Sequence, residues 1–165
     1  MSGSQRRLSH VDERGRSRMV DVSSKPPTAR VAQARGRVFM NAAALEQILS
    51  GTAAKGDVLG VARLAGILAA KQTASLVPLC HVVPLDHVAV EVEADMRAGC
   101  VEITSRISCR AATGVEMEAI VAVCIAAATV YDMCKAVDRS MRISDIELLE
   151  KRGGRSGTYR ARGRA

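Results

Sequence analysis

The stretch HVAVEVEADMRAGCVEITSRISC, residues 87–109, decides the fold that we expect for this sequence. Apolar residues recur at alternate positions on either side of a short polar segment that ends in Gly99: Val88, Val90, Val92, Val101, Ile103 and Ile107. Successive side chains of a strand point to opposite faces of the sheet. The pattern therefore predicts two antiparallel strands, His87–Ala94 and Cys100–Cys109, which are joined by a hairpin and have one buried face and one wet face.

Helices are predicted on both sides of this hairpin. After it, Thr113-Gly114-Val115-Glu116 has the Ser/Thr-x-x-Glu form of a capping box, and the helix it would begin extends to about Val137. Before it, Asn41 and Asp57 are good N-caps for two helices, Ala42–Leu49 and a longer one that extends to about Ser75. The second and third of these helices in chain order are so apolar that we expect them to be buried on most sides.

Two further strands complete the pattern. Thr28–Met40 and Ile143–Leu149 are the remaining strand candidates, so the predicted order is strand, helices, strand, strand, helix, strand. This is the order of the split βαβ unit. The predicted fold class is α+β, a ferredoxin-like split βαβ sandwich with an antiparallel sheet and helices packed on one face.

The charge distribution suggests how the chain is divided. Its 165 residues suit one domain, and the net charge is +7. Residues 1–18 carry a net +3 and residues 151–165 a net +6, so residues 19–150 carry a net −2. We predict a mobile basic arm at 1–18, a single catalytic domain at 19–150 and a flexible Gly/Arg-rich tail at 151–165, where the tail is either solvated or a cover for an anionic ligand.

The composition also bears on compartment and partners. Five cysteines without a Cys-x-x-Cys pair indicate a reducing compartment, and we expect a cytoplasmic protein. The apolar run Ala119–Tyr131 is shorter than the ~20 residues needed to span a bilayer, so no membrane association is expected. With only Phe39, Tyr131 and Tyr159 as aromatic residues, the core is built from small side chains, which hints at stabilisation by subunit contacts.

A nucleic-acid partner is not expected, although the fold order overlaps with that of RNA-recognition domains. Those domains stack bases on aromatic residues of their central strands. The two strands of 87–109 contain no Phe, Tyr or Trp.

Charged residues near the ends of the predicted helices are the candidates for chemistry. Glu118 and Asp132 bracket the apolar helix, and Lys135 lies one turn beyond Asp132. They could form an ordinary surface ion pair, but charges beside so apolar a helix are better explained by a cleft or a subunit interface. Lys55 precedes a helix start, where backbone N–H groups favour phosphate, although it could equally be a solvated lysine. Cys80-His81 alone is not a metal site, and the chain has neither a Walker motif nor a dinucleotide fingerprint.

Several segments, in order, resemble the cyclic pyranopterin monophosphate synthase family, the MoaC proteins of molybdenum cofactor biosynthesis. They are Met19-Val20-Asp21-Val22-Ser23, Ala54-Lys55-Gly56-Asp57-Val58, Ala62-Arg63-Leu64-Ala65-Gly66-Ile67, Pro78-Leu79-Cys80-His81, Thr113-Gly114-Val115-Glu116-Met117-Glu118-Ala119 and Tyr131-Asp132-Met133-Cys134-Lys135-Ala136-Val137. The resemblance runs from about His10 to Tyr159.

The resemblance implies a lyase that converts 3′,8-cyclo-7,8-dihydro-GTP to cyclic pyranopterin monophosphate and releases diphosphate. It also implies a ferredoxin-like homohexamer, a trimer of dimers, with active sites at subunit interfaces. No cofactor is implied, and a Mg²⁺ ion bound to the triphosphate is left open. Position by position, the implied catalytic residues are Asp132, Lys135 and Lys55. The implied substrate-binding residues are Leu79, Cys80, His81, Met117, Glu118, Glu116 and Arg30.

Three departures from the family pattern leave a second hypothesis open. Val82-Val83 stands where the family usually has Pro-Leu, Ala111-Ala112 where it has Gly followed by Lys or Arg, and Gln72 where it has Arg. Two of these changes remove a cation, and Arg110 could compensate for Ala112. The alternative to an active synthase is a non-catalytic or specialised paralogue that acts as an assembly partner.

Overall fold

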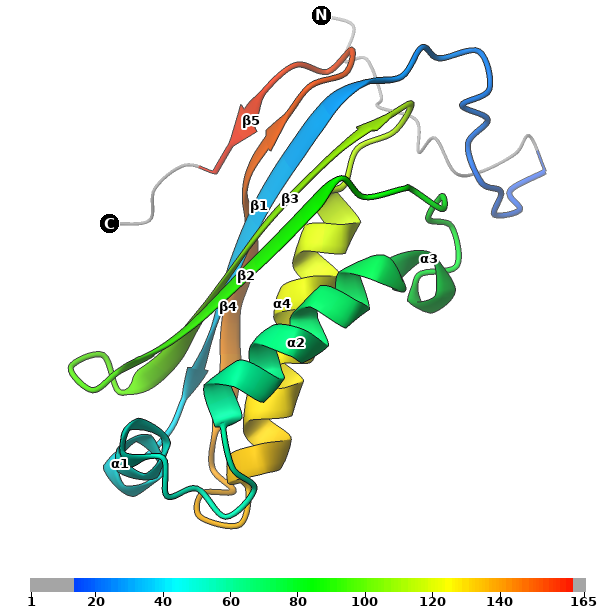
Figure 1. Ribbon diagram of the computed structural model, residues 1–165. Helices are drawn as coiled ribbons and strands as arrows, with labels where there is room; N and C mark the ends of the chain where they lie inside the picture. The colour runs from blue at the N-terminus through cyan, green and yellow to red at the C-terminus, as the bar shows by residue number, and fades with distance from the viewer. Residues whose placement is uncertain (1–13, 162–165) are drawn as a thin grey trace, which may run out of the picture.

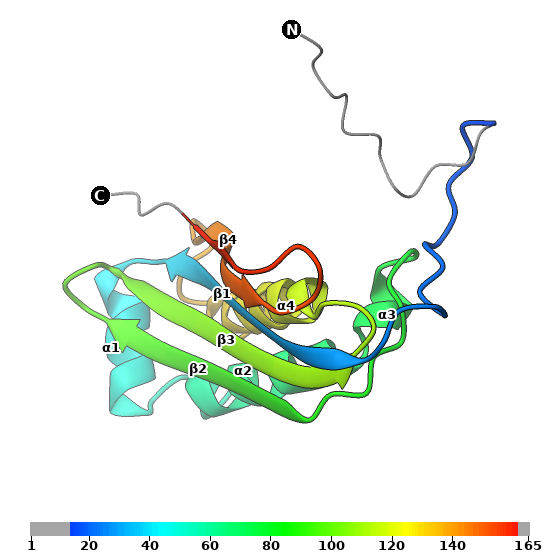
Figure 2. The same cartoon turned by 90° about the horizontal axis from the view of Figure 1, so that it is seen from above.

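A computed structural model describes residues 14–161, which form a five-stranded antiparallel sheet whose helices all lie against one face (Figures 1 and 2). The strands are β1 Thr28–Phe39, β2 His87–Asp95, β3 Cys100–Ala111, β4 Arg142–Arg152 and β5 Tyr159–Arg160. The helices are α1 Ala42–Ser50, α2 Val58–Lys71, α3 Thr73–Leu76 and α4 Glu116–Cys134.

The sheet has the strand order β2-β3-β1-β4-β5, and every neighbouring pair is antiparallel. The first four strands have the arrangement expected of a split βαβ unit. The hairpin predicted from residues 87–109 pairs His87–Asp95 with the facing strand from Ser108 to Cys100. The predicted α+β, ferredoxin-like fold is confirmed.

Small residues allow α2, α4 and the sheet to approach closely. Gly36 of β1 faces Val123 of α4, where an added Cβ would lie only 2.6 Å from Val123 Cγ1. At Gly66 of α2, an added Cβ would lie 3.0 Å from the Ala122 carbonyl oxygen and 3.1 Å from Val90. The core therefore contains few large side chains and gains its stability from close approach.

Helix α4 is the centre of this core. By length and composition alone it could cross a membrane, but here it packs against α2 and the sheet. Its buried residues are Glu118, Ala119, Val121, Ala122, Val123, Ala126, Ala127, Val130, Met133 and Cys134. Its apolar character is therefore that of a core helix.

The structure confirms three of the predicted helix ends. Asn41 accepts a hydrogen bond of 2.9 Å from the Ala44 N–H, and Asp57 accepts one of 2.9 Å from the Gly60 N–H. Gly51 ends α1 in the left-handed conformation, with φ of 69°.

The predicted capping box is wrong. Helix α4 begins at Glu116, its N-cap is Val115, and no side chain accepts a hydrogen bond there. Val115 is 1% exposed, so packing of this residue sets where the helix starts, and Thr113 stands two positions too early to cap it. Glu116 and Glu118 instead place negative charge in the first turn, where the helix dipole favours it.

Other boundaries also differ from prediction. The long upstream helix ends at Lys71 and a separate turn, α3, follows, because the Thr73 hydroxyl donates to the Ala69 and Ala70 carbonyls at 3.2 and 3.1 Å. Helix α4 ends at Cys134, not near Val137. Strand β4 extends to Arg152, and β5 pairs with it inside the region predicted as tail. Most of the predicted arm, residues 1–13, lies outside the described residues, as do residues 162–165 of the tail.

Candidate functional site

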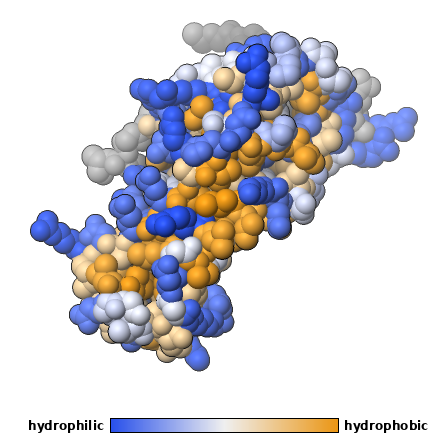
Figure 3. Space-filling view, in the orientation of Figure 1, coloured by the Kyte–Doolittle hydropathy of each residue, from blue (hydrophilic) through white to orange (hydrophobic). Residues whose placement is uncertain are grey.

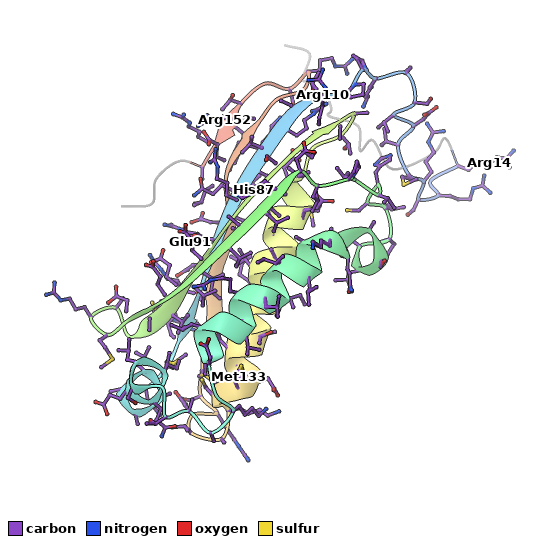
Figure 4. All side chains as sticks on the ribbon, viewed as in Figure 1. Arg14, His87, Glu91, Arg110, Met133 and Arg152 are labelled. Atoms are coloured by element: carbon purple, nitrogen blue, oxygen red, sulfur yellow. The ribbon has the colours of Figure 1, made fainter. Side chains whose placement is uncertain are left out.

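The predicted site residues collect at the two ends of α4. One cluster lies at its C-terminal end and contains Lys55, Asp132 and Lys135. The other lies at its N-terminal end and contains Leu79, Cys80, His81, Glu116, Met117 and Glu118. Figure 4 shows the two ends: Met133 marks the C-terminal end of α4, and Arg110, at the end of β3, lies at the opposite end of the molecule.

The C-terminal cluster is a carboxylate held between two ammonium groups. Lys55 Nζ lies 2.6 Å from Asp132 Oδ2, and Lys135 Nζ lies 2.7 Å from Asp132 Oδ1. Lys55 also donates to the Asp132 backbone carbonyl at 3.0 Å. Lys135 pairs as the sequence predicted, while Lys55 reaches across from the loop before α2 to Asp132, 77 residues further along the chain.

This geometry explains the charge state of Asp132. Hydrogen bonds from Lys135 and then Lys55, together with their positive charges, lower the pKa of Asp132 to about 2. All three side chains are about half exposed, and they line a hollow of about 390 Å³ with Tyr131 and Arg139. The cluster offers two proton-bearing ammonium groups, fixed by one carboxylate, to whatever enters that hollow.

The N-terminal cluster lines a larger pocket of about 640 Å³. The connector after α3 contributes Leu79, Cys80 and His81, and the first turn of α4 contributes Glu116, Met117 and Glu118. Residues 19–25, called here the N-terminal strap, form the remaining wall through Val20, Val22 and Lys25. Sequence reasoning missed this wall, although Val20 and Val22 lie two apart, a spacing that points both side chains to one side of an extended chain.

Burial tunes the acid and the thiol of this pocket. Glu118 is 5% exposed, and this desolvation, with a contribution from the nearby charge of Glu116, raises the pKa of its carboxyl above the ordinary value. Burial, and then the charge of Glu118, raises the pKa of the Cys80 thiol. Glu118 can therefore hold a proton more readily than an exposed glutamate, and Cys80 remains a neutral thiol.

A basic pocket of about 600 Å³ adjoins the N-terminal cluster and shares Lys25 and Glu116 with it. It is lined by Lys25, Pro26, Thr28, Arg30, Ala112, Thr113, Gly114, Glu116, Lys151, Gly154, Arg155 and Ser156. Arg30 donates from Nε to the Ala111 carbonyl at 3.2 Å and from Nη2 to the Ala112 carbonyl at 3.1 Å. Its guanidinium packs against Gly154, where any side chain would collide with it. Four cations and one acid make this pocket suited to a phosphorylated group.

Ala112, which stands where the family pattern of the sequence analysis has Lys or Arg, lies in this pocket. Arg110 does not line the pocket. It is exposed and alternates with buried Cys109 and Ala111, so it projects from the sheet face opposite the helices. Arg30 contacts the Ala112 carbonyl, and Lys151 and Arg155 line the same pocket. Lys151 and Arg155 come from the region that the sequence suggested as a cover for an anionic ligand.

The two clusters are too far apart to act together within one chain. Glu118 and Asp132 are 14 residues apart on one continuous helix, which corresponds to about 21 Å at 1.5 Å per residue. Among residues 14–161, no three His, Cys, Asp or Glu side chains converge in a way that could hold a metal ion. Fold and site together define a ferredoxin-like α+β protein with a lysine–carboxylate cluster and a basic pocket suited to a phosphorylated group.

Comparisons with known proteins identify the family. The model of the MoaC family matches residues 19–154. The cyclic pyranopterin monophosphate synthase of Thermomicrobium roseum is 59% identical over 153 residues, covering 93% of this chain and 92% of that protein. The synthase of Chloroflexus aggregans is 57% identical over 159 residues, covering 96% of each chain. Cyclic pyranopterin monophosphate synthase 1 of Mycobacterium bovis is 56% identical over 153 residues, covering 93% of this chain and 89% of that protein.

This chain belongs to the MoaC family. The match covers both clusters and the N-terminal strap, and it ends at Gly154 inside the basic pocket.

Proposed function

We propose that this chain is a cyclic pyranopterin monophosphate synthase, a lyase that converts 3′,8-cyclo-7,8-dihydro-GTP to cyclic pyranopterin monophosphate and diphosphate. The observation that carries the proposal is the Lys55–Asp132–Lys135 cluster, with contacts of 2.6 and 2.7 Å, in a chain 59% identical to a protein of that name. Ring opening and reclosure require proton transfers, and the two lysines are suited to supply them.

We assign the two pockets at the N-terminal end of α4 to different parts of the substrate. His81, Cys80 and Glu118 border the pocket that we assign to the purine-derived ring system, where a glutamate of raised pKa can donate or accept a hydrogen bond. Lys25, Arg30, Lys151 and Arg155 border the pocket that we assign to the triphosphate. Cations there stabilise the negative charge that develops on the departing diphosphate. A Mg²⁺ ion, where one takes part, would arrive bound to the phosphates.

We propose further that each active site is assembled from two copies of the chain. The two clusters lie about 21 Å apart along α4, and Ile125 is midway between Glu118 and Asp132. A twofold axis near Ile125 would set two α4 helices antiparallel and place Glu118 of each copy near Asp132 of the other. Such an isologous contact creates two equivalent sites.

The helical face has the apolar surface that this contact requires. Ile125 is 37% exposed at the middle of α4, and Val61, Leu64 and Leu68 are each 45–58% exposed on α2, which packs against α4. Figure 3 shows an apolar band that crosses the face covered by α2 and α4. Burial of this band by a second copy would stabilise a chain whose own core has few large side chains. The hexamer of three such dimers and a cytoplasmic location stay predictions.

The first test is diphosphate release by the purified protein from 3′,8-cyclo-7,8-dihydro-GTP, with formation of the cyclic phosphate followed in the same sample. We expect turnover by the wild-type chain and a loss of at least about 100-fold in Lys135→Ala, the scale of one acid–base group. Leu49→Ala is the matched control, because Leu49 lies on α1 outside the three pockets. Turnover by Lys135→Ala equal to that of wild type would refute the assigned role.

The alternative, a non-catalytic or specialised paralogue, is favoured by Ala112, Val82 and Gln72. If it holds, the wild-type chain will release no diphosphate, and Ala112→Lys combined with Gln72→Arg and Val82→Pro will create or greatly raise activity. An active wild-type chain that gains nothing from these three changes would leave this alternative without support.

A further inference from the structure

The N-terminal strap contacts the site through one hydrogen bond whose chemistry is unambiguous. His81 Nε2 lies 2.7 Å from the backbone carbonyl oxygen of Val20. A carbonyl oxygen can only accept, so the proton of this bond belongs to Nε2. In the neutral imidazole the other nitrogen, Nδ1, then carries the lone pair. Within residues 14–161 Nδ1 has no hydrogen-bond partner, and His81 lines the pocket of about 640 Å³.

The strap itself is held in shape by local hydrogen bonds. Asp21 Oδ1 accepts from the Ser23 N–H at 2.9 Å, and the Val22 carbonyl accepts from the Lys25 N–H at 3.0 Å. Val20 and Val22 are half-buried against the pocket, whereas Met19, Asp21 and Ser23 are exposed. Short Asx-type turns of this kind order a segment without regular secondary structure. The carbonyl that meets His81 therefore lies directly before a hydrogen-bonded turn.

We infer that the N-terminal strap is a positioning element for His81. The Val20 carbonyl fixes the imidazole with its proton on Nε2, and Nδ1 is thereby left as the hydrogen-bond and proton acceptor toward a ligand in the pocket. The neighbouring Val20 and Val22 side chains close the same pocket on the strap side, and Lys25 extends it toward the basic pocket. The part of this inference that concerns substrate rests on the proposed function.

The tautomer can be read directly in the full-length protein labelled with ¹⁵N-histidine. At a pH where the ring is neutral, we expect His81 to show a protonated Nε2, an unprotonated Nδ1 and a slowly exchanging Hε2 proton. His87, which is exposed on β2, is the internal reference. A His81 ring that carries its proton on Nδ1, or an Hε2 proton that exchanges as fast as that of His87, would overturn the inference.

Asp21→Ala tests whether the strap does the positioning, because Asp21 shapes the strap but does not line the pocket. We expect the Hε2 signal of His81 to lose its protection, trypsin to cut faster after Arg18, and kcat/KM to fall about three- to tenfold, the effect of losing one hydrogen bond. Asp95→Ala is the matched control, because Asp95 accepts equivalent backbone bonds from Arg97 and Ala98 in the β2–β3 turn.

The outcomes separate cleanly. Faster cleavage after Arg18 with an unchanged His81 signal would show that the strap moves without positioning the ring, and it would refute the inference. The same refutation follows if Asp95→Ala reproduces every effect of Asp21→Ala. The NMR and proteolysis measurements use the free protein, so they decide the strap's role even if the chain proves inactive on 3′,8-cyclo-7,8-dihydro-GTP.

Discussion

At the scale of single residues, Asp132 shows how two weak surface ion pairs together fix the positions of three charged groups. Either lysine pair alone would be an ordinary exposed ion pair of little energetic value. Here one carboxylate receives an ammonium group on each oxygen, which lowers its pKa to about 2 and fixes both Nζ atoms. The cluster therefore serves to position the two ammonium groups and their protons, and it contributes little to the stability of the fold.

The pKa of Asp132 is directly measurable by following its carboxyl carbon in an NMR titration. We expect a midpoint near pH 2 and a rise toward the ordinary 3.8 in Lys135→Ala, because the Lys135 contact is the largest cause of the shift. A carboxyl with a lowered pKa favours folding above its ordinary pKa, and the contribution is lost as the pH falls from 3.8 to about 2. A midpoint near 3.8 in the wild-type chain would contradict the geometry.

Glu118 has the opposite behaviour. Because burial raises its pKa, the folded chain binds this proton more tightly than the unfolded chain does. Its contribution to stability is therefore present below the ordinary value of 4.5 and is lost as the pH rises through the raised value. We expect Glu118→Gln to unfold at a higher temperature than wild type at pH 8, and the gain to shrink toward pH 4.

The same substitution should lower synthase activity, since stability and function are often traded at such sites. Thermal unfolding at several pH values and a turnover assay on the same samples check both statements. Equal melting temperatures of Glu118→Gln and wild type at pH 8 would mean that Glu118 is not desolvated.

At the scale of elements, α2 and α4 pack closely because Gly66 has no side chain at their contact. Gly66 occupies the point where α2 meets Ala122 and Val90, and an added Cβ there would lie within 3.0–3.1 Å of both neighbours. Two consequences follow for the site. The loop before α2 is brought close enough for Lys55 to reach Asp132, and the exposed residues of α2 lie beside those of α4.

Gly66→Leu should therefore force α2 away from α4. We expect a loss of about 1–3 kcal/mol in the free energy of unfolding, the usual cost of overpacking a core, and a lower activity because Lys55 moves with α2. Ala65→Leu is the control, since Ala65 is half-buried on the same helix. Urea denaturation measures the difference, and equal stability of the two variants would show that the contact at Gly66 can relax.

At the scale of the whole molecule, the two ends of α4 are the central observation. If each active site takes Glu118 from one copy and Asp132 from another, two inactive variants can restore each other. We expect Asp132→Ala and Glu118→Ala to be inactive alone. Co-expressed in equal amounts, they should recover about a quarter of wild-type activity, because half of the dimers are mixed and each mixed dimer has one intact site. No recovery from a verified mixed dimer would place the whole site within one chain.

The interface itself is tested at Ile125. Ile125→Glu puts a charge at the proposed twofold axis, where two copies would face each other at a desolvated contact, so we expect the assembly to dissociate. Leu49→Glu, at a similarly exposed apolar residue on α1, should leave the assembly intact. Light scattering of both variants decides the matter, and an unchanged mass for Ile125→Glu would exclude this face as the interface.

The sequence by itself determined the order of the first four strands and the helices along the chain, the helix ends at Asn41, Gly51 and Asp57, the Asp132–Lys135 pair and the family. These features depend on alternation, capping and spacing within a few residues, or on motifs in a fixed order. They can be predicted because residues close in sequence interact with one another whatever the rest of the fold. The roles assigned to the site residues remain predictions.

Only the tertiary structure decided where α4 begins, that Lys55 reaches Asp132, that the N-terminal strap meets His81, and that the clusters lie at opposite ends of one helix. Each of these depends on contacts between segments far apart in the sequence, 77 residues in the case of Lys55 and Asp132. Packing of Val115 overrode a good capping motif, because burial of a core residue outweighs one local hydrogen bond.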